Sequence, residues 1–306
     1  MSPDLVVRGA ASTGGALALA PLMLGIIHRT RSLAVGRSGP PLLQPYAGLA
    51  KLLRKGAVYS RTTTWWFQAG PVIGLAAVAG SLALVPMMGL PAPLGFDGDL
   101  ILFVALLALM RFLTMLAALD TGSSFEGMGV SREAAFSALV EPALVIGLAT
   151  LVRGTGGFSL SSLMGPRLGL AWLTMGPALA LVAVSFFVVL LAENARIPVD
   201  DPATHLELTM IHEVMILDHS GPDLAFLEYA GALRLWIFGA LLASLTIPRT
   251  GALVLDAALF VAGMGLVAVL VGIVESTMAR LQLIRVPQLL LGASVLSAFS
   301  LVLTLR

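Results

Sequence analysis

Cysteine is absent from this chain of 306 residues, and charged side chains make up only 11% of it. Without thiolates the chain cannot itself hold an iron–sulfur cluster of the usual kind or a thiolate-bound nickel ion. The scarcity of charge, with 58% hydrophobic residues and a mean hydropathy of +0.96, argues against a water-soluble globule. A net charge of +1 favours neither nucleic acid nor acidic partners. The sequence therefore predicts an integral membrane protein.

Motifs of catalysis are also missing. The chain has no Gly-rich phosphate loop and no Ser nucleophile with a matched base. A zinc site is disfavoured because Ile216 stands where the motif beginning at His212 and Glu213 needs its second His. The sequence thus predicts no catalytic residue, no metal site and no cofactor in this chain.

Eight apolar runs approach the roughly 20 residues that a helix needs to cross a bilayer. Open-chain spans must be helices, since only helices satisfy their own backbone groups in lipid. We therefore predict an all-α integral membrane protein, a single membrane domain over residues 1–306. The N-terminus lacks a cleavable signal pattern, so the first run is expected to be retained. The predicted spans are Gly9–Ile27, Trp66–Leu90, Leu100–Leu119, Ala134–Leu151, Leu170–Ala192, Leu224–Leu245, Leu253–Val274 and Pro287–Leu305.

Basic residues predict the orientation, because Lys and Arg gather in cytoplasmic loops. The first loop, residues 28–65, holds no acid and the basic residues Arg29, Arg31, Arg37, Lys51, Arg54, Lys55 and Arg61. The same side carries Arg132, Arg196, Arg280 and Arg285, against Arg8, Arg153, Arg167, Arg249 and Arg306 on the other. We therefore predict a multi-pass protein with both termini outside.

The first loop also contains a predicted amphipathic helix. After a Gly-Pro turn, its leucines recur at helical spacing, and Lys51, Arg54 and Lys55 alternate with them. Such a helix lies in the membrane interface. The pattern is equally typical of a surface anchor and of a seat for an extrinsic partner.

One segment, residues 193–228, concentrates the ionisable groups. It holds eight of the seventeen carboxylates and three of the four histidines. A helix predicted to start at Asp201 and Pro202 would place His205 and His212 on one face. Clustered carboxylates at a membrane boundary are expected to have raised, coupled pKa values and to exchange protons. Asp218, His219 and Asp223 fit a solvated loop better.

Three predicted spans carry charges of their own, and an intramembrane charge is a functional candidate by default. These are Arg111, Glu141, Glu228 and Arg234; a helix-locking Arg and Glu pair is the alternative. The candidates for proton coupling are Glu141, Glu193, Asp200, Glu207, Glu213 and Glu228. Arg111, Asp120, Arg196, His205 and His212 are expected to support them.

These residues resemble a known family, the membrane subunit shared by respiratory complex I and the related membrane-bound [NiFe]-hydrogenases. The complex I pattern A-E-T-N-R-A-P-F-D-L-P-E-A-E-S-E-L is similar to AENARIPVDDPATHLEL in this chain. The shared positions are Glu193, Arg196, Pro198, Asp200, Pro202, Glu207 and Leu208. The strings RSGPPLLQPYAGLAKLLRK and LEYAGAL resemble two further family signatures, and Arg111 and Asp120 resemble a family Arg and Glu nine residues apart.

Departures from the complex I pattern favour the hydrogenase branch. Ala203 and His205 replace acidic residues, and Pro41 replaces an Asn. The resemblance implies a prokaryotic cell-membrane subunit of a formate hydrogenlyase or group 4 hydrogenase complex that links electron transfer to proton or sodium translocation. It implies partners: hydrogenase-like large and small subunits with iron–sulfur clusters, a [NiFe] centre where retained, and antiporter-like membrane subunits. Arg37, Gln44, Lys51 and Arg54 would form the docking surface.

Two alternatives remain open from the sequence. One is the quinone-chamber subunit of complex I itself. The other is a free-standing secondary transporter, which should show internal repeats and broken paired helices.

Overall fold

The computed structural model describes residues 3–201, 210–247 and 249–305, and within them the chain forms helices and no β-strand. In this described part of the chain eight helices are long and apolar enough to cross a membrane, which confirms the all-α class and the eight predicted spans. They are α1 (Pro3–Ala34), α3 (Trp65–Leu82), α4 (Asp99–Asp120), α5 (Ser124–Thr155), α7 (Arg167–Glu193), α9 (Gly221–Thr246), α10 (Leu253–Thr277) and α11 (Val286–Leu303). The shorter helices are α2 (Gln44–Leu53), α6 (Leu160–Leu163) and α8 (His212–Met215).

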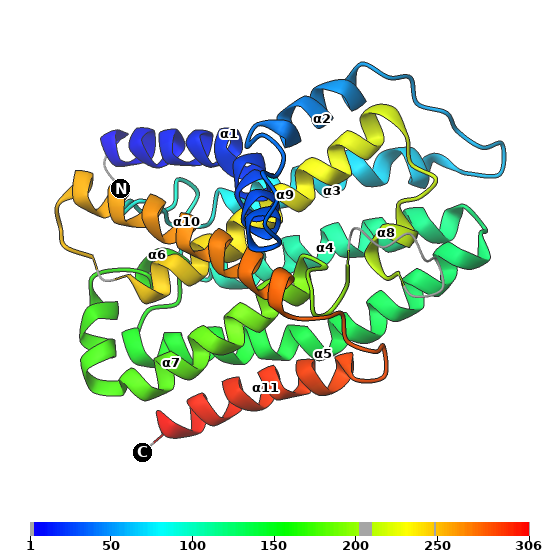
Figure 1. Ribbon diagram of the computed structural model, residues 1–306. Helices are drawn as coiled ribbons and strands as arrows, with labels where there is room; N and C mark the ends of the chain where they lie inside the picture. The colour runs from blue at the N-terminus through cyan, green and yellow to red at the C-terminus, as the bar shows by residue number, and fades with distance from the viewer. Residues whose placement is uncertain (1–2, 202–209, 248, 306) are drawn as a thin grey trace.

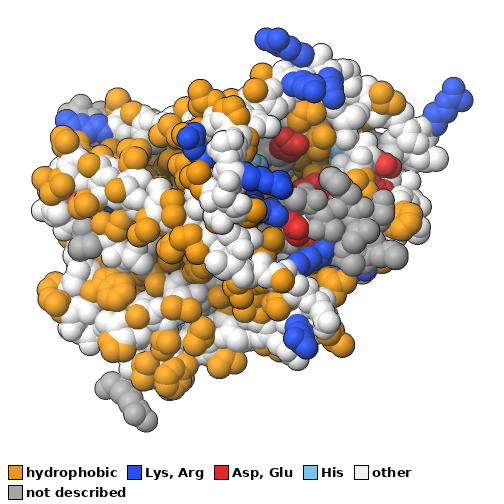
Figure 2. Space-filling view, in the orientation of Figure 1, with side chains coloured by type: hydrophobic (Ala, Val, Ile, Leu, Met, Phe, Trp, Pro, Cys, Tyr) orange, Lys and Arg blue, Asp and Glu red, His pale blue; other side chains and the backbone are white. Residues whose placement is uncertain are grey.

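Helix α9 forms the centre of the bundle (Figure 1). In its most apolar stretch 72% of the residues are buried, against 28–44% in the other seven spans. It packs against α1, α3, α7 and α10, while α11 packs on α5 and α7. Both termini lie at one end of the bundle, and α2 and α8 lie toward the other. Most Lys and Arg side chains on the face in Figure 2 also lie toward that second end.

Some predicted boundaries differ from the structure. Helix α3 ends at Leu82, whereas the predicted span ran to Leu90. Pro86 has no N–H to donate and disfavours helical backbone at the residue before it, so the helix ends earlier. Helix α5 extends past its predicted apolar run at both ends, and the left-handed Gly156 (φ +70°) terminates it. The helix predicted from Asp201 falls on residues 202–209, outside the described residues.

The amphipathic helix predicted in the first loop is confirmed as α2, and no α2 residue is buried. It is held against α1 where α1 contains a proline. Pro21 lacks the N–H that would pair with the Leu17 carbonyl, and the Tyr229 hydroxyl donates to that oxygen at 2.8 Å. The Tyr46 hydroxyl of α2 donates to the next carbonyl, that of Ala18, at 2.6 Å. Two tyrosines therefore join α1 to α2 and α9.

Close approach fixes the segment before α2 as well. A Cβ on Gly25 of α1 would lie 2.1 Å from the Leu42 carbonyl oxygen. Only glycine allows the two backbones to approach this closely.

Buried hydroxyl groups join α11 to its neighbours. The Ser185 and Ser297 hydroxyls are 2.8 Å apart, and the Thr150 and Ser300 hydroxyls are 3.1 Å apart. Ser297 also lies within donating distance, 2.8 Å, of the Ala143 carbonyl. Such interhelical hydrogen bonds replace the hydrophobic driving force that lipid does not supply.

Candidate functional site

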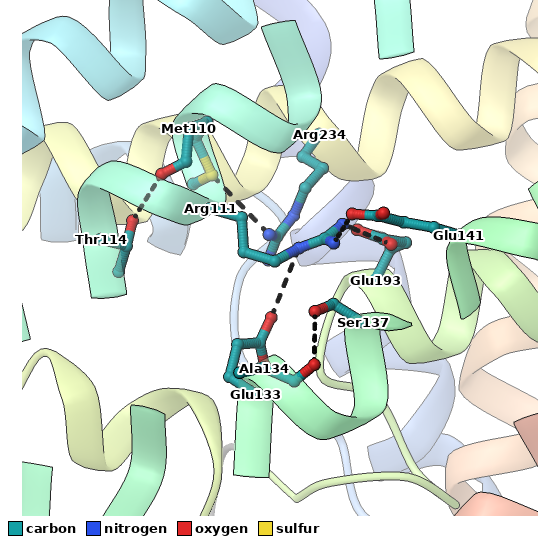
Figure 3. A network of polar contacts seen from close by, with 9 residues as sticks. All are labelled: Met110, Arg111, Thr114, Glu133, Ala134, Ser137, Glu141, Glu193 and Arg234. Carbon is teal, nitrogen blue, oxygen red and sulfur yellow. Dashed lines mark hydrogen bonds and ion pairs between the residues drawn. The ribbon is translucent and has the colours of Figure 1, made fainter. Parts of the chain in front are cut away.

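Arg111 of α4 lies at the centre of a group of carboxylates from α5 and α7, which we call the Arg111 cluster: Arg111, Glu133, Glu141 and Glu193 (Figure 3). Its Nη1 donates to Glu141 Oε1 at 2.5 Å, and its Nη2 donates to the two oxygens of Glu193 at 2.6 and 2.7 Å. Its Nε lies 3.7 Å from Glu133 Oε1. The Arg111 side chain is only 6% exposed. These contacts explain how α4 accommodates a cation, because a buried charge needs partners.

A second arginine, Arg234 of α9, borders the Arg111 cluster (Figure 3). It is buried, and its Nη1 lies 3.8 Å from the sulfur of Met110. Its Nε has no hydrogen-bond partner among the described residues. The same side chain lines a cavity, so Arg234 is adjacent both to the cluster and to that cavity.

This large cavity, of about 400 Å³, lies between α1, α2, α8, α9 and the turn after α7. Its volume is in the range of small-molecule sites. The polar residues of its lining are His28, Gln44, Asn194, Arg196, His212, Glu213, Glu228 and Arg234. The first loop and the 193–228 segment thus meet at one chamber.

Two neighbouring side chains of the cavity wall have strongly shifted pKa values. Burial first, and then the carboxylates of Asp200 and Glu228, raise the pKa of Glu213 to about 7 against the opposing effect of Arg196. Burial, and then the charge of Arg234, lowers the pKa of His212 to about 3. At neutral pH, His212 is therefore uncharged, and Glu213 is near its midpoint and can exchange a proton.

Asp200 has a different environment in the same segment. Its carboxylate accepts the backbone N–H groups of Ile211 and His212 at 3.1 Å each, and Arg280 pairs with it at 2.8 Å. Burial raises its pKa, and these donors oppose the rise. Asp200 therefore joins the two ends of the stretch that contains residues 202–209.

The turn after α7 is fixed by a buried ion pair to α10. Arg196 Nη1 lies 3.2 Å from Glu275 Oε1, and both side chains are buried. Arg31, at the end of α1, lies 4.0 Å from the other Glu275 oxygen. The pair holds Arg196 in the wall of the large cavity.

Comparison with known proteins identifies the family. The profile of the NADH dehydrogenase family matches residues 11–305. The chain belongs to the NADH dehydrogenase family. This confirms the resemblance inferred from residues 193–208.

Relatives of this NADH dehydrogenase family member include two proteins of Escherichia coli (strain K12). Hydrogenase-4 component C is 30% identical over 90% of this chain and 88% of that protein. Formate hydrogenlyase subunit 4 is 28% identical over 89% of this chain and 90% of that protein. The fold is shared by a chain in the structure of the membrane-bound sulfane sulfur reductase, an archaeal respiratory membrane complex. The two chains match with a TM-score of 0.84 and 19% identity, over 98% of this chain and 99% of that one.

The structure of this chain brings some of the predicted site residues together and separates others. Glu141, Glu193 and Arg111 meet in the Arg111 cluster, and Glu213, Glu228, Arg196 and His212 line the large cavity. Asp120 lies elsewhere: its oxygens accept the N–H and hydroxyl of Thr64 at 2.6 and 2.8 Å, at the start of α3. His205 and Glu207 lie outside the described residues. The predicted docking residues Arg37, Gln44, Lys51 and Arg54 are all exposed.

Two carboxylates of the site were absent from the predicted set. Glu133 precedes Glu141 by eight residues, about two helical turns, so one helix face carries both. That spacing could have revealed Glu133. Glu275 lies in the last turn of α10 and ends an apolar run, a position that resembles an ordinary helix end in sequence.

The solvated-loop interpretation is wrong for His219 and Asp223, which are 4% and 6% exposed, and fits only the exposed Asp218. The His219 ring stacks on Phe67 of α3 with ring centroids 4.0 Å apart. Burial lowers the pKa of His219 to about 4. Among the described residues, no group of three or more His, Asp or Glu side chains is placed to hold a metal ion.

Proposed function

We propose that this chain is the membrane-anchoring, ion-coupling subunit of a formate hydrogenlyase or group 4 hydrogenase-like complex. Peripheral hydrogenase-like large and small subunits would hold the iron–sulfur clusters and, where retained, a [NiFe] centre. Antiporter-like membrane subunits would carry protons or sodium ions across the bilayer. The names of the two relatives, a hydrogenase-4 component and a formate hydrogenlyase subunit, support this assignment.

One observation carries the coupling role: a proton-exchanging carboxylate and a buried charge network share Arg234 as a neighbour. Glu213 has a pKa of about 7 in the wall of the large cavity. Arg234 lines the same cavity and borders the Arg111 cluster. A change of charge at the cavity, such as reduction of a nearby redox centre in a partner, would therefore alter the proton affinity of both.

Glu141 supports an onward path into a membrane partner. Its side chain is 43% exposed although it lies in the transmembrane helix α5, and Arg111 contacts one of its oxygens. A carboxylate facing hydrocarbon at mid-membrane costs on the order of 2.5 kcal/mol or more. We propose that an adjacent membrane subunit covers this side chain with a polar group or a water-filled path.

The first loop supports docking of the peripheral module. Helix α2 has no buried residue, and its neighbourhood combines exposed Lys51 and Arg54 with exposed Leu43 and Leu53. A surface with both apolar and basic side chains suits a protein partner as its cover. The docking role of Arg37, Gln44, Lys51 and Arg54 belongs to this proposal.

Substitution of two carboxylates tests the coupling role in the assembled complex. Glu193→Gln and Glu228→Gln should lower coupled turnover while blue-native gels show unchanged assembly. Glu126→Gln is the matched control, because Glu126 is buried at the start of α5 and bonds Thr121 away from Arg111. Unchanged coupled activity in both test variants would refute the assignment of these residues.

Purification tests the identity of the complex. The chain would be isolated from its native membrane in mild detergent, with its partners identified by mass spectrometry and nickel and iron measured in the same sample. Nickel with iron, hydrogen evolution and antiporter-like subunits would support the proposal. A lone, metal-free chain would favour the transporter.

The large cavity favours a second candidate, the quinone chamber of complex I, because about 400 Å³ suffices for a small ring with polar partners. A quinone-analogue photolabel that attached to residues 28–65 or near Asp200 would favour it. So would iron without nickel, together with flavin and NADH oxidation.

A further inference from the structure

The Arg111 cluster and the bordering Arg234 together contain one more negative than positive group. Its three carboxylates face two guanidinium groups, those of Arg111 and Arg234. An uncompensated charge within a membrane protein is costly, and a proton on one carboxylate removes it. The contacts with Arg111 indicate which of the three carboxylates carries this proton.

The three carboxylates are bound to Arg111 with unequal strength. Glu193 accepts two hydrogen bonds and Glu141 accepts one, all at 2.5–2.7 Å, which stabilises their ionised forms. Glu133 lies 3.7 Å from Arg111 Nε and makes no direct hydrogen bond with it. The ionised form of Glu133 is therefore the least stabilised of the three.

A second, small cavity of about 20 Å³ adjoins Glu133. It is lined by the carboxylates of Glu133, Glu193 and Asp200 and by Ser137, with apolar side chains around them. A cavity of at least about 10–15 Å³ can hold one water molecule if two to four polar groups surround it. This cavity meets both conditions.

Arg111 does not line the small cavity, but its side chain supplies a separate indication of a ligand beside Glu133. Its Nε is buried, points toward Glu133 and has no hydrogen-bond acceptor among the described residues. Buried N–H groups are almost always paired, and a polar contact longer than about 3.5 Å is commonly bridged by water. One water between Arg111 Nε and Glu133 would satisfy the donor.

We propose that Glu133 is a further proton-carrying residue of this protein and exchanges its proton with a water molecule held between Glu133, Glu193 and Arg111. In the exchange, the water gives one proton to the Glu133 carboxylate and takes one from Glu193, so the water itself is unchanged. Glu133 is then protonated, and Glu141 and Glu193 remain ionised in their contacts with Arg111. This inference rests on the proposed coupling function and adds a residue to it.

Proton translocation by the intact complex in sealed membrane vesicles tests the role of Glu133. Glu133→Gln should slow proton translocation by about 100-fold or more, the scale of losing a positioned proton-transfer group, and so lower the protons moved per electron, while electron transfer with a protonophore stays within about twofold. Glu133→Asp should restore part of the ratio, because the carboxylate remains. Glu126→Gln, a buried glutamate on the same helix, should match the unsubstituted protein.

The outcomes separate the inference from the proposed function. A normal ratio in Glu133→Gln with a reduced ratio in Glu193→Gln would overturn the role of Glu133 alone. Normal ratios in both would overturn the coupling function with it. Equal loss in Glu133→Asp and Glu133→Gln, with equal loss of electron transfer, would also overturn the proposal, since that pattern indicates only a structural contact.

A readout without turnover tests the water. A cryo-EM map of the intact complex that resolves ordered water should show density within hydrogen-bond distance of both Arg111 Nε and Glu133. Density absent there, with Arg111 Nε bonded directly to the Glu133 carboxylate, would overturn the bridge.

Discussion

Substitution of Arg111 by methionine should destabilise the protein far more than loss of an exposed arginine. The side chain of methionine retains the apolar volume of the Arg stem but leaves Glu193 without the cation that donates to both its oxygens. The Glu193 side chain is 4% exposed, so bulk water cannot replace the guanidinium group. Removal of one partner from a buried ion pair costs about 3–5 kcal/mol. We expect Arg111→Met to lower the free energy of unfolding by that amount.

The assay is reversible unfolding of the purified protein by SDS in mixed micelles, followed by far-UV circular dichroism. The double variant Arg111→Met with Glu193→Gln should be more stable than the sum of the single effects predicts, by on the order of 1–3 kcal/mol, because no ionised Glu193 remains unpaired. Arg153→Met is the control, since Arg153 is exposed and its Nε donates to the Thr304 carbonyl just after α11. Equal destabilisation by Arg111→Met and Arg153→Met, or additive single effects in the double variant, would refute this account of the cluster.

Three further predictions concern other contacts. The folded-state pKa of His219 is about 4, below its usual 6.5. The free energy of unfolding should therefore fall by up to about 3 kcal/mol as pH drops from 6.5 to 4. His219→Phe should abolish that part of the pH dependence in unfolding titrations. Ser297→Ala should cost about 0.6–1.7 kcal/mol, and a double-mutant cycle with Ser185→Ala should show coupling of similar size. Gly25→Ala should displace the segment at Leu42, detected as faster proteolysis of the first loop, whereas Ala at the uncrowded Gly14 should not.

The sequence predicted the spans well because the membrane imposes a length and an apolar composition that each span must satisfy alone. The end of α3 was missed for a local reason: the apolar run continues past Leu82, but Pro86 does not continue the helix. The partners of Arg111 were not predictable in the same way. Glu193 is 82 residues away from Arg111, and only the packing of α4 against its neighbours decides which carboxylates it meets.

His219 shows the same limit. The residues around it include Ser220, Gly221 and Pro222, which are typical of a loop. Burial comes from Phe67, far away in sequence, which stacks on the ring. Local composition reports whether a residue can face water, whereas tertiary contacts decide whether it does.

The 193–228 segment is therefore not one uniform proton-exchanging cluster, although its composition suggested one. Asp200 accepts three backbone N–H groups and pairs with Arg280, which oppose the rise in pKa that burial causes and tie its charge to the local fold. Glu213 is in the same segment and is half-buried; burial, and then its carboxylate neighbours Asp200 and Glu228, raise its pKa to about 7. A carboxylate in the environment of Asp200 stabilises the local fold, whereas a carboxylate in the environment of Glu213 exchanges protons. Neutralisation of Asp200 should accordingly disturb the structure, whereas neutralisation of Glu213 should leave the structure and remove a proton-exchanging group.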